Sequence, residues 1–159
     1  MQYYLFGTTD ADPWNGVGIG FQVYRSRDLK LWSEPEYAFR PPEGFWGTKN
    51  FWAPEVHHYE SSWYLIASFY AENRHRGVHI FRSVQITGPY VPISGSPSTP
   101  EDWDCLDGTL YVEENTPWLV FSHEWTQIQN GAICALPLDD HVEHAPEFVG
   151  NVQGNEFVQ

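Results

Sequence analysis

The segment Trp63-Tyr64-Leu65-Ile66 decides the fold, because similar aromatic and aliphatic segments stand on either side of it, Tyr3-Tyr4-Leu5-Phe6 and Pro117-Trp118-Leu119-Val120. The first two copies begin 60 residues apart, and the second and third begin 54 residues apart. Aromatic and β-branched residues favour the pleated, half-buried surface of a sheet. Each copy is therefore predicted to form one strand of a repeated unit.

A second predicted strand follows each copy after a turn-rich gap, and each of these strands opens with glycine. They are Gly20-Phe21-Gln22-Val23-Tyr24-Arg25-Ser26, Gly77-Val78-His79-Ile80-Phe81-Arg82-Ser83 and Gly131-Ala132-Ile133-Cys134-Ala135-Leu136. A repeat of this length that holds several short strands is typical of propeller blades. Sandwiches also have many short strands, but they do not normally repeat a two-strand module at one period. The sequence predicts an all-β fold, a β-propeller.

The chain contains a partial first unit, a complete second unit and a partial third unit. One blade cannot bury both faces of its sheet, and too few blades to close a ring leave apolar faces exposed. We expect either a fragment of a longer propeller or self-association of copies through these exposed blade faces. We also expect at least two four-stranded antiparallel sheets, with the strands at Ala53–Val56 and Leu106–Leu110 innermost and side by side.

The amino-acid composition supports the all-β prediction and limits the classes of molecule that the chain is expected to bind. Aromatic residues make up 17% of the 159 residues, and 13 Gly and 12 Pro leave little room for long helices. The formal net charge of −13 disfavours binding to nucleic acid and to anionic membrane surfaces. Carboxylates and indoles suit a neutral, hydroxyl-rich ligand, because carboxylates accept hydrogen bonds and indoles stack on apolar ring faces.

The two cysteines and the N-terminal residues give indications of the cellular compartment. Cys105 and Cys134 match no zinc spacing, and two buried free thiols are favoured over one disulfide. No run of residues reaches the roughly 18 apolar residues of a membrane span. The N-terminus lacks the features of a signal peptide, so a cytoplasmic protein is expected if Met1 is the genuine start.

Several segments resemble glycoside hydrolase family 43, in order along residues 3–138, and residues 139–159 form a tail that we leave unassigned. The segments are Tyr3-Tyr4-Leu5-Phe6-Gly7-Thr8-Thr9, Val23-Tyr24-Arg25-Ser26-Arg27-Asp28-Leu29, Phe51-Trp52-Ala53-Pro54-Glu55-Val56, Leu106-Asp107-Gly108-Thr109-Leu110-Tyr111 and Val120-Phe121-Ser122-His123-Glu124-Trp125. The Trp-Ala-Pro-acid motif is the most specific of them. The resemblance implies about three blades of a five-bladed propeller that hydrolyses arabinofuranosyl or xylosyl linkages with inversion.

The resemblance also implies a catalytic residue, Asp107. Family members use three carboxylates: a general base in the first blade, an Asp that tunes the acid and holds substrate in the third, and a general acid in the fourth. Asp107 matches the second of these, whereas the base would lie before Met1 and the acid beyond Gln159. We therefore expect the chain alone to be inactive, and we expect no cofactor and no metal.

Other residues are candidates for substrate binding. Glu55 opens an otherwise apolar strand, so it is expected to line a polar pocket that it shares with Asp107, although a structural ion pair is the alternative. Trp46 and Trp52 flank the loop before this strand, and one or both could stack on a sugar. A core position between blades is an equal alternative for these tryptophans.

His123 and Glu124 end a predicted strand, and we place both with the substrate-binding residues. Glu124 could in principle replace the missing acid. Its position, 17 residues after Asp107 in the same blade, argues against that role. Asp12 and Pro13 lie in a loop that we expect to be a solvated turn.

Two functions remain open. The favoured function is a glycosidase of arabinose- or xylose-containing plant polysaccharide, with an oligosaccharide or polysaccharide as its partner. The alternative is a non-catalytic carbohydrate-binding or assembly module. The sugar and the linkage depend on loops that the sequence alone does not define.

Overall fold

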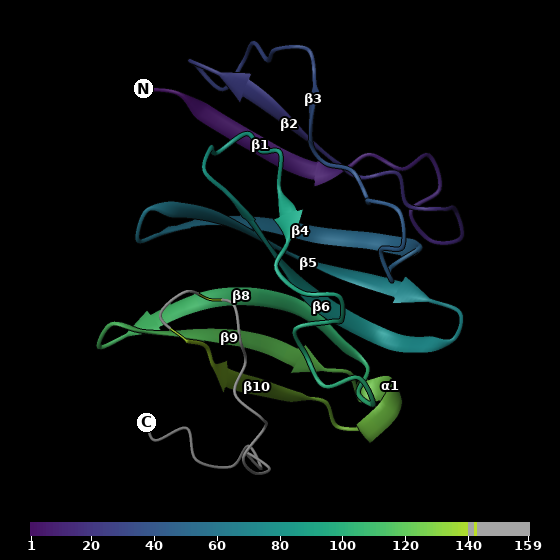
Figure 1. Cartoon of the computed structure of the whole chain (residues 1–159). Helices are drawn as coiled ribbons and strands as arrows, with labels where there is room; N and C mark the ends of the chain where they lie inside the picture. Colours follow the sequence, from purple (N-terminus) through teal and green to yellow (C-terminus); the bar gives the residue numbers. More distant parts are fainter. Residues whose placement is uncertain (140–141, 143–159) are drawn as a thin grey trace.

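The computed structural model describes residues 1–139 and residue 142, and it is built almost entirely of strands (Figure 1). The elements are β1 (Tyr3–Thr8), β2 (Phe21–Ser26), β3 (Glu36–Phe39), β4 (Lys49–Tyr59), β5 (Ser62–Ala71), β6 (Arg74–Ser83), β7 (Val91–Pro92), β8 (Cys105–Glu113), β9 (Thr116–His123), α1 (Trp125–Ile128) and β10 (Ala132–Pro137). The predicted all-β class is confirmed.

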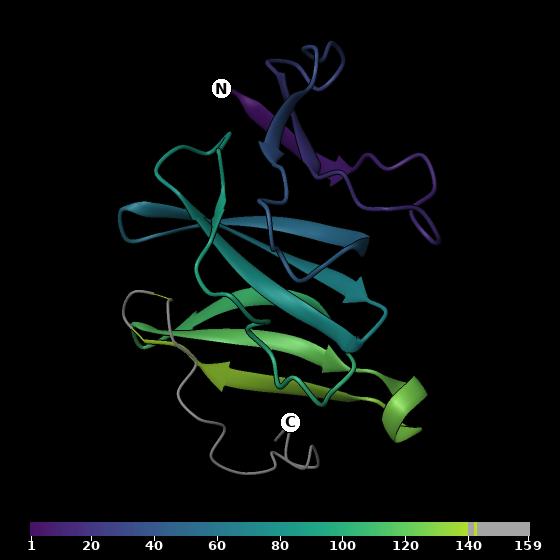
Figure 2. The same cartoon turned by 45° about the vertical axis from the view of Figure 1, so that its right-hand side comes forward.

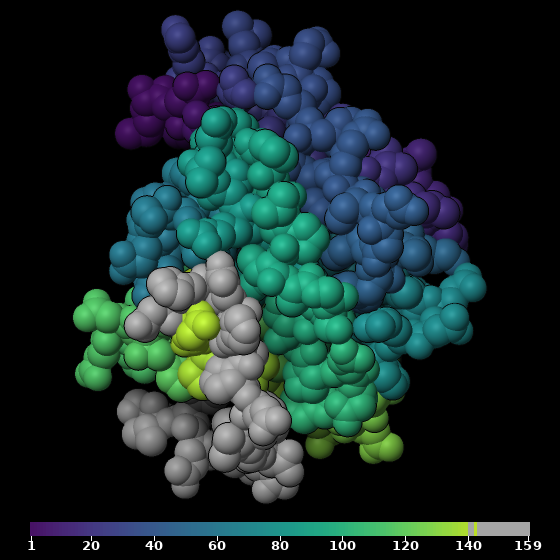
Figure 3. All heavy atoms as spheres, viewed as in Figure 1, coloured from purple at the N-terminus to yellow at the C-terminus, as the bar shows by residue number. Residues whose placement is uncertain are grey.

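The strands form three antiparallel sheets that follow one another along the chain (Figures 1 and 2). The sheets are β1-β2-β3, β4-β5-β6-β7 and β8-β9-β10, and consecutive strands pair in each. With all atoms drawn as spheres, the colours succeed one another from purple through teal to green (Figure 3). This arrangement is that of three successive propeller blades.

The prediction of at least two four-stranded sheets is wrong for the described residues, where only the sheet β4-β5-β6-β7 has four strands. The repeat explains why. It aligns β1 with β5, so the first sheet contains no counterpart of β4 among these residues. It aligns β10 with β6, and the counterpart of β7 would follow Pro137, where few described residues remain.

The predicted contact between the two strands is confirmed, whereas their innermost position stays a prediction. β4 and β8 each form one edge of their own sheet, and the two strands contact each other. Oγ1 of Thr109 in β8 lies 3.4 Å from Nε2 of His57 in β4, directly after the predicted segment Ala53–Val56.

Two hydrophobic layers hold the three sheets together. One lies between the first and second sheets and is largely aromatic, with Phe21, Phe39, Phe51, Phe69 and Phe81 fully buried. The other lies between the second and third sheets and is more aliphatic, with Ile66, Val78, Ile80, Leu119 and Leu136 buried. Alternate residues of β5 point to opposite faces, so this strand supplies both layers. Stacking of neighbouring blades thus creates the core.

The two cysteines lie in the second layer. Cys105 and Cys134 are buried free thiols, as predicted. Burial raises the pKa of Cys105 to about 12, so the thiol stays protonated and unreactive at neutral pH.

The tail predicted at residues 139–159 lies outside the described residues except for Asp139 and Val142. In the part of the chain that is described, no helix is long and apolar enough to cross a membrane.

Candidate active site at the bulged end of the strands

The candidate site lies where β1, β5 and β9 end and where β4, β6 and β8 begin, on the right of Figure 1. The strand registers slip at this end: between Lys49 and Glu55 in β4, between Phe69 and Ala71 in β5, and between Leu106 and Thr109 in β8. Bulges of this kind bend a strand and turn its side chains toward new directions. We call this the bulged end.

Asp107 sits within the register slip of β8. Its φ of 55° is in the left-handed region, which is uncommon for a residue other than glycine. Its backbone N–H donates to Oγ of Ser68 at 3.0 Å, which fixes the bulge against β5. The bulge leaves the Asp107 side chain exposed.

Gly108 allows this bulge to pack closely on the second sheet. A Cβ atom at this position would lie 2.4 Å from Cγ1 of Val78 and 3.0 Å from Cγ2 of Ile66. The contact with Val78 is closer than real Cβ atoms show, and the contact with Ile66 is tighter than most of them. Glycine at 108 therefore lets β8 approach β5 and β6 directly beneath Asp107.

The environment of Asp107 disfavours its charged form. Desolvation raises the pKa of Asp107 most, and the negative charge of Glu124 raises it further, whereas the positive charge of Arg76 lowers it. Asp107 is therefore a more easily protonated carboxyl than an ordinary surface aspartate.

Arg76 and Glu124 form a largely buried ion pair. Nε of Arg76 lies 2.8 Å from Oε1 of Glu124, and the two side chains are only 17% and 13% exposed. The other carboxylate oxygen of Glu124 accepts a hydrogen bond of 2.7 Å from the hydroxyl of Thr126. β9 ends at His123, and Glu124 is the N-cap residue of α1, so the chain turns sharply at this carboxylate.

The guanidinium of Arg76 also covers an aromatic ring. Its Cζ lies 4.4 Å from the centre of the Trp52 ring and 5.6 Å from that of Tyr70. Its Nη1 donates to Oδ1 of Asn50 at 3.3 Å, and its backbone N–H donates to Oδ1 of Asp104 at 3.0 Å. Arg76 thus links the second sheet to the third.

The structure separates the two candidate tryptophans. Trp52 lies at the bulged end, where its Nε1 donates to the carbonyl oxygen of Pro13 at 2.7 Å. Trp46 is 8% exposed and lies in the first hydrophobic layer, where its Nε1 donates to Nδ1 of His79 at 3.0 Å. A ring at this depth presents no open face to a sugar. Trp46 therefore takes the core position that was its alternative, and the expectation that it binds substrate is not met.

Glu55 lies on β4 with its side chain exposed, and its Oε1 is 3.3 Å from Nε2 of His57. His57 also lies 3.4 Å from Oγ1 of Thr109, two residues after Asp107. His57 therefore connects Glu55 to β8, the neighbouring strand. The polar cavity shared by Glu55 and Asp107 stays a prediction.

His123 is buried beside the site. Its ring stacks on Trp103 with centres 4.2 Å apart, and its Nε2 lies 2.6 Å from Oε1 of Gln127. Gln127 in turn accepts from the backbone N–H of Asp104 at 2.8 Å. In this arrangement His123 supports the chain around Glu124.

Sequence reasoning did not single out Arg76, Asn50 or Tyr70. Arg76 is one of only eight Lys and Arg residues in the chain, and it is the third residue of β6, shortly after the turn at residues 72–73. A cation so placed in an acidic chain is the signal that could have indicated a carboxylate partner. Asn50 and Tyr70 carry no comparable signal, because their roles depend on contacts with Arg76 in another strand, which only the fold creates.

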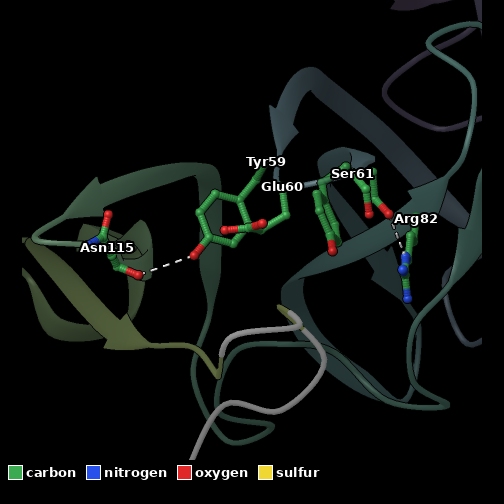
Figure 4. A pocket seen from close by; sticks show the side chains of 7 residues that line it. Tyr59, Glu60, Ser61, Arg82 and Asn115 are labelled. Atoms are coloured by element: carbon green, nitrogen blue, oxygen red, sulfur yellow. Dashed lines mark hydrogen bonds between the residues drawn. The ribbon is translucent and has the colours of Figure 1, made fainter.

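A surface pocket of about 460 Å³ lies at the opposite end of the strands (Figure 4). Its lining residues include Tyr59, whose hydroxyl donates to the carbonyl oxygen of Asn115, and Arg82, which donates to Ser62. Of the described residues that line it, only Glu60 carries a carboxylate. Asp107 and Glu124, whose charge raises the pKa of Asp107, lie at the bulged end instead. Among the described residues, no group of three or more His, Cys, Asp or Glu side chains could hold a metal ion.

The chain belongs to glycosyl hydrolases family 43, whose family model matches residues 1–150. A comparison with curated proteins gives no match. Among solved structures, an endo-arabinase from Bacteroides thetaiotaomicron is 35% identical with a TM-score of 0.80, and the match covers 89% of this chain and 48% of that chain. An endo-1,4-beta-xylanase from the same organism is 29% identical with a TM-score of 0.65, over 89% of this chain and 45% of that chain.

An arabinanase from Bacillus subtilis shares the fold, with 21% identity and a TM-score of 0.64 over 91% of this chain and 50% of that chain. The chain thus spans about half the length of these three solved structures. Its three sheets are blades of the propeller of this family, and the resemblance to glycoside hydrolase family 43 is confirmed.

Proposed function

We propose that the chain is part of an inverting glycoside hydrolase that acts on arabinose- or xylose-containing plant polysaccharides. Family membership supports a glycosidase-type hydrolase. The arabinose and xylose specificity is supported by two neighbours above 25% identity, which are named as an endo-arabinase and an endo-1,4-beta-xylanase.

The observation that carries the proposal is the placement of Asp107. Its left-handed backbone and the hydrogen bond from its N–H to Ser68 direct an exposed carboxyl outward at the bulged end, beside Glu124 and Arg76. A carboxylate there can accept hydrogen bonds from sugar hydroxyls. Asp107 is the substrate-holding carboxylate of this proposal, and its charge favours the protonated form of a nearby general acid.

Glu124 does not fit the role of general acid. An acid must carry a proton in order to protonate the leaving oxygen, and inversion also needs a second carboxyl about 6.5–9.5 Å away as the base. Both oxygens of Glu124 are already held in contacts within the chain, Oε1 by Nε of Arg76 at 2.8 Å and Oε2 by the hydroxyl of Thr126 at 2.7 Å. The proposal therefore leaves both proton transfers to groups other than Glu124, and Glu124 holds Arg76 in place.

Hydrolysis assays test this assignment. The purified 159-residue chain should release negligible sugar from aryl arabinofuranosides, aryl xylosides, arabinan and xylan, because each missing acid or base costs about 10²–10⁴-fold in rate. Clear hydrolysis that Glu124→Gln abolishes would contradict the assignment. Clear hydrolysis that Asp107→Asn leaves unchanged would contradict the role of Asp107.

Sugar binding tests the substrate class. Arabinotriose or xylotriose should bind with a Kd on the order of millimolar, and Asp107→Asn should weaken this binding. Glu113→Gln is the matched control, because Glu113 is an exposed carboxylate at the other end of the same strand. Cellotriose serves as the hexose comparison. Equal binding of cellotriose would contradict the pentose specificity.

A non-catalytic carbohydrate-binding module remains the second candidate. The Arg76–Glu124 ion pair favours this module, because the pair holds a carboxylate of the bulged end in a structural contact. The coding sequence on either side of the chain discriminates the two candidates. Additional blades that carry a matching general base and general acid would favour the hydrolase, and flanking sequence without them would favour the module.

A further inference from the structure

We propose that Trp14, in the loop between β1 and β2, is the surface on which a pentose unit of the substrate stacks, at a subsite next to the carboxylates. The inference rests on the proposed function and names a binding residue for it. Trp14 is 70% exposed. A single exposed indole is common on protein surfaces, and what sets Trp14 apart is how firmly its backbone is held.

Two side chains of β4 anchor the loop of Trp14. Nδ2 of Asn50 donates to the carbonyl oxygens of both Pro13 and Trp14, at 3.0 and 2.9 Å, and Nε1 of Trp52 donates to that of Pro13 at 2.7 Å. Asn50 is buried and adopts a φ of 52° within the strand. The left-handed backbone of Asn50 thus lets its buried amide group hold the backbone beneath the exposed ring of Trp14.

The loop also has its own internal support. Oδ1 of Asp12 accepts from the backbone N–H groups of Trp14 and Asn15, at 3.1 and 3.0 Å. These bonds confirm the predicted turn and lower the pKa of Asp12, so its carboxylate stays charged and bonded at neutral pH. The loop is therefore ordered before any ligand arrives, which reduces the entropy lost on binding.

Trp52 is less suited to stacking than its position in the sequence motif indicated. The guanidinium of Arg76 lies 4.4 Å from the centre of its ring, and the ring of Trp14 meets it at 4.9 Å and 67°. Its indole N–H is already bonded to Pro13. Trp52 thus supports its neighbours, and Trp14 is the member of this pair that offers an open surface.

Contacts between neighbours define the subsite. Trp14 touches Trp52, Trp52 touches Arg76, and Arg76 is paired with Glu124. Two side chains thus separate the indole of Trp14 from the carboxylate of Glu124. A pentose on Trp14 would therefore lie beside the unit held by Asp107. The apolar C–H face of a neutral sugar ring suits an indole, and the neutral ring avoids repulsion from a chain of net charge −13.

Calorimetric titration of the 159-residue chain with arabinotriose and with xylotriose tests the proposal. Trp14→Ala should raise the Kd about tenfold, which is the effect of losing roughly 50–60 Å² of apolar contact. Trp14→Phe should retain part of the affinity. Two control variants should bind as the unchanged chain does: Trp125→Ala, which removes an equally exposed indole on α1, and Trp32→Ala, which removes one between β2 and β3.

The outcomes separate this inference from the function. If Trp14→Ala binds as the unchanged chain does while Asp107→Asn binds more weakly, Trp14 is not the stacking surface and the proposed function stands. If Trp125→Ala lowers the affinity and Trp14→Ala does not, stacking occurs on α1 and the inference is wrong. If the unchanged chain binds neither sugar, both proposals fail. Light scattering adds a further check, since a change of oligomeric state in Trp14→Ala would assign the indole to a contact between copies.

Discussion

The two ends of β4 and β8 are built differently. At one end, β4 turns into β5 through Glu60 and Ser61, and β8 turns into β9 through Glu114 and Asn115, with regular pairing up to the turn. The left-handed residues there are Glu60, Glu114 and Asn115, which are turn positions. At the bulged end, the left-handed residues Asn50, Ala53 and Asp107 lie inside strands.

The positions of the left-handed residues show which of them the turns require and which of them shape the candidate site. A two-residue hairpin turn requires left-handed residues because their twist matches that of the strands. No such requirement exists inside a strand, where a left-handed residue costs energy and persists only if its surroundings hold it. At the bulged end these residues direct Asp107 outward and let Asn50 reach the loop of Trp14. The strained positions and the candidate site therefore coincide.

The largest expected effect comes from breaking the ion pair at the bulged end. Arg76→Met should lower the free energy of unfolding by about 2–4 kcal/mol, because it leaves the nearly buried Glu124 carboxylate without a counter-charge. Arg25→Met removes the comparable ion pair with Glu36, whose side chains are more exposed, and should cost less than about 1 kcal/mol. Urea unfolding followed by fluorescence measures both variants. Equal effects would show that the bulged end has no special electrostatic role.

A smaller effect is expected from filling the space beside Asp107. Gly108→Ala should destabilise the chain by about 1–3 kcal/mol, since its Cβ would overlap Val78 and Ile66. Gly95→Ala is the control, because no atom lies within 4 Å of the Cβ that it would add. Thermal unfolding compares the two variants. A neutral Gly108→Ala would mean that β8 can move away from the second sheet without cost.

The smallest pair of effects concerns two left-handed asparagines. Asn50→Gly keeps the backbone conformation but removes the hydrogen bonds to Pro13 and Trp14, so it should cost about 1–2 kcal/mol and speed amide exchange in the loop. Asn115→Gly should change stability by no more than a few tenths of a kcal/mol, because glycine suits this turn position. Hydrogen exchange of residues 12–19 that is unaltered in Asn50→Gly would contradict the anchoring role of Asn50.

Local patterns in the sequence predicted much of the fold. The repeated aromatic and aliphatic segments indicated the three blades, and each copy lies in the strand expected of it, in β1, β5 or β9. Buried free thiols at Cys105 and Cys134 were also predictable, because isolated cysteines usually pack as small apolar groups.

The details of the site were not predictable in the same way. The bulges in β4 and β8 arise from packing between sheets, which no local pattern encodes. Arg76 acquires its role only when β6 approaches α1 and Trp52. The sequence could not distinguish Trp46 from Trp52 either, because burial of Trp46 depends on His79 in a strand 33 residues further along.

The central claim is that the bulged end binds a pentose oligosaccharide, and amide chemical shifts measured during titration with arabinotriose test it most directly. We expect the shifted amide and indole resonances to come from residues 12–16, 50–53, 104–108 and 124, with Trp14 among the most affected. The residues around the opposite pocket, Tyr59, Ser62, Arg82 and Asn115, should stay unchanged. Shifts confined to that opposite pocket, or no shifts at all, would contradict the account.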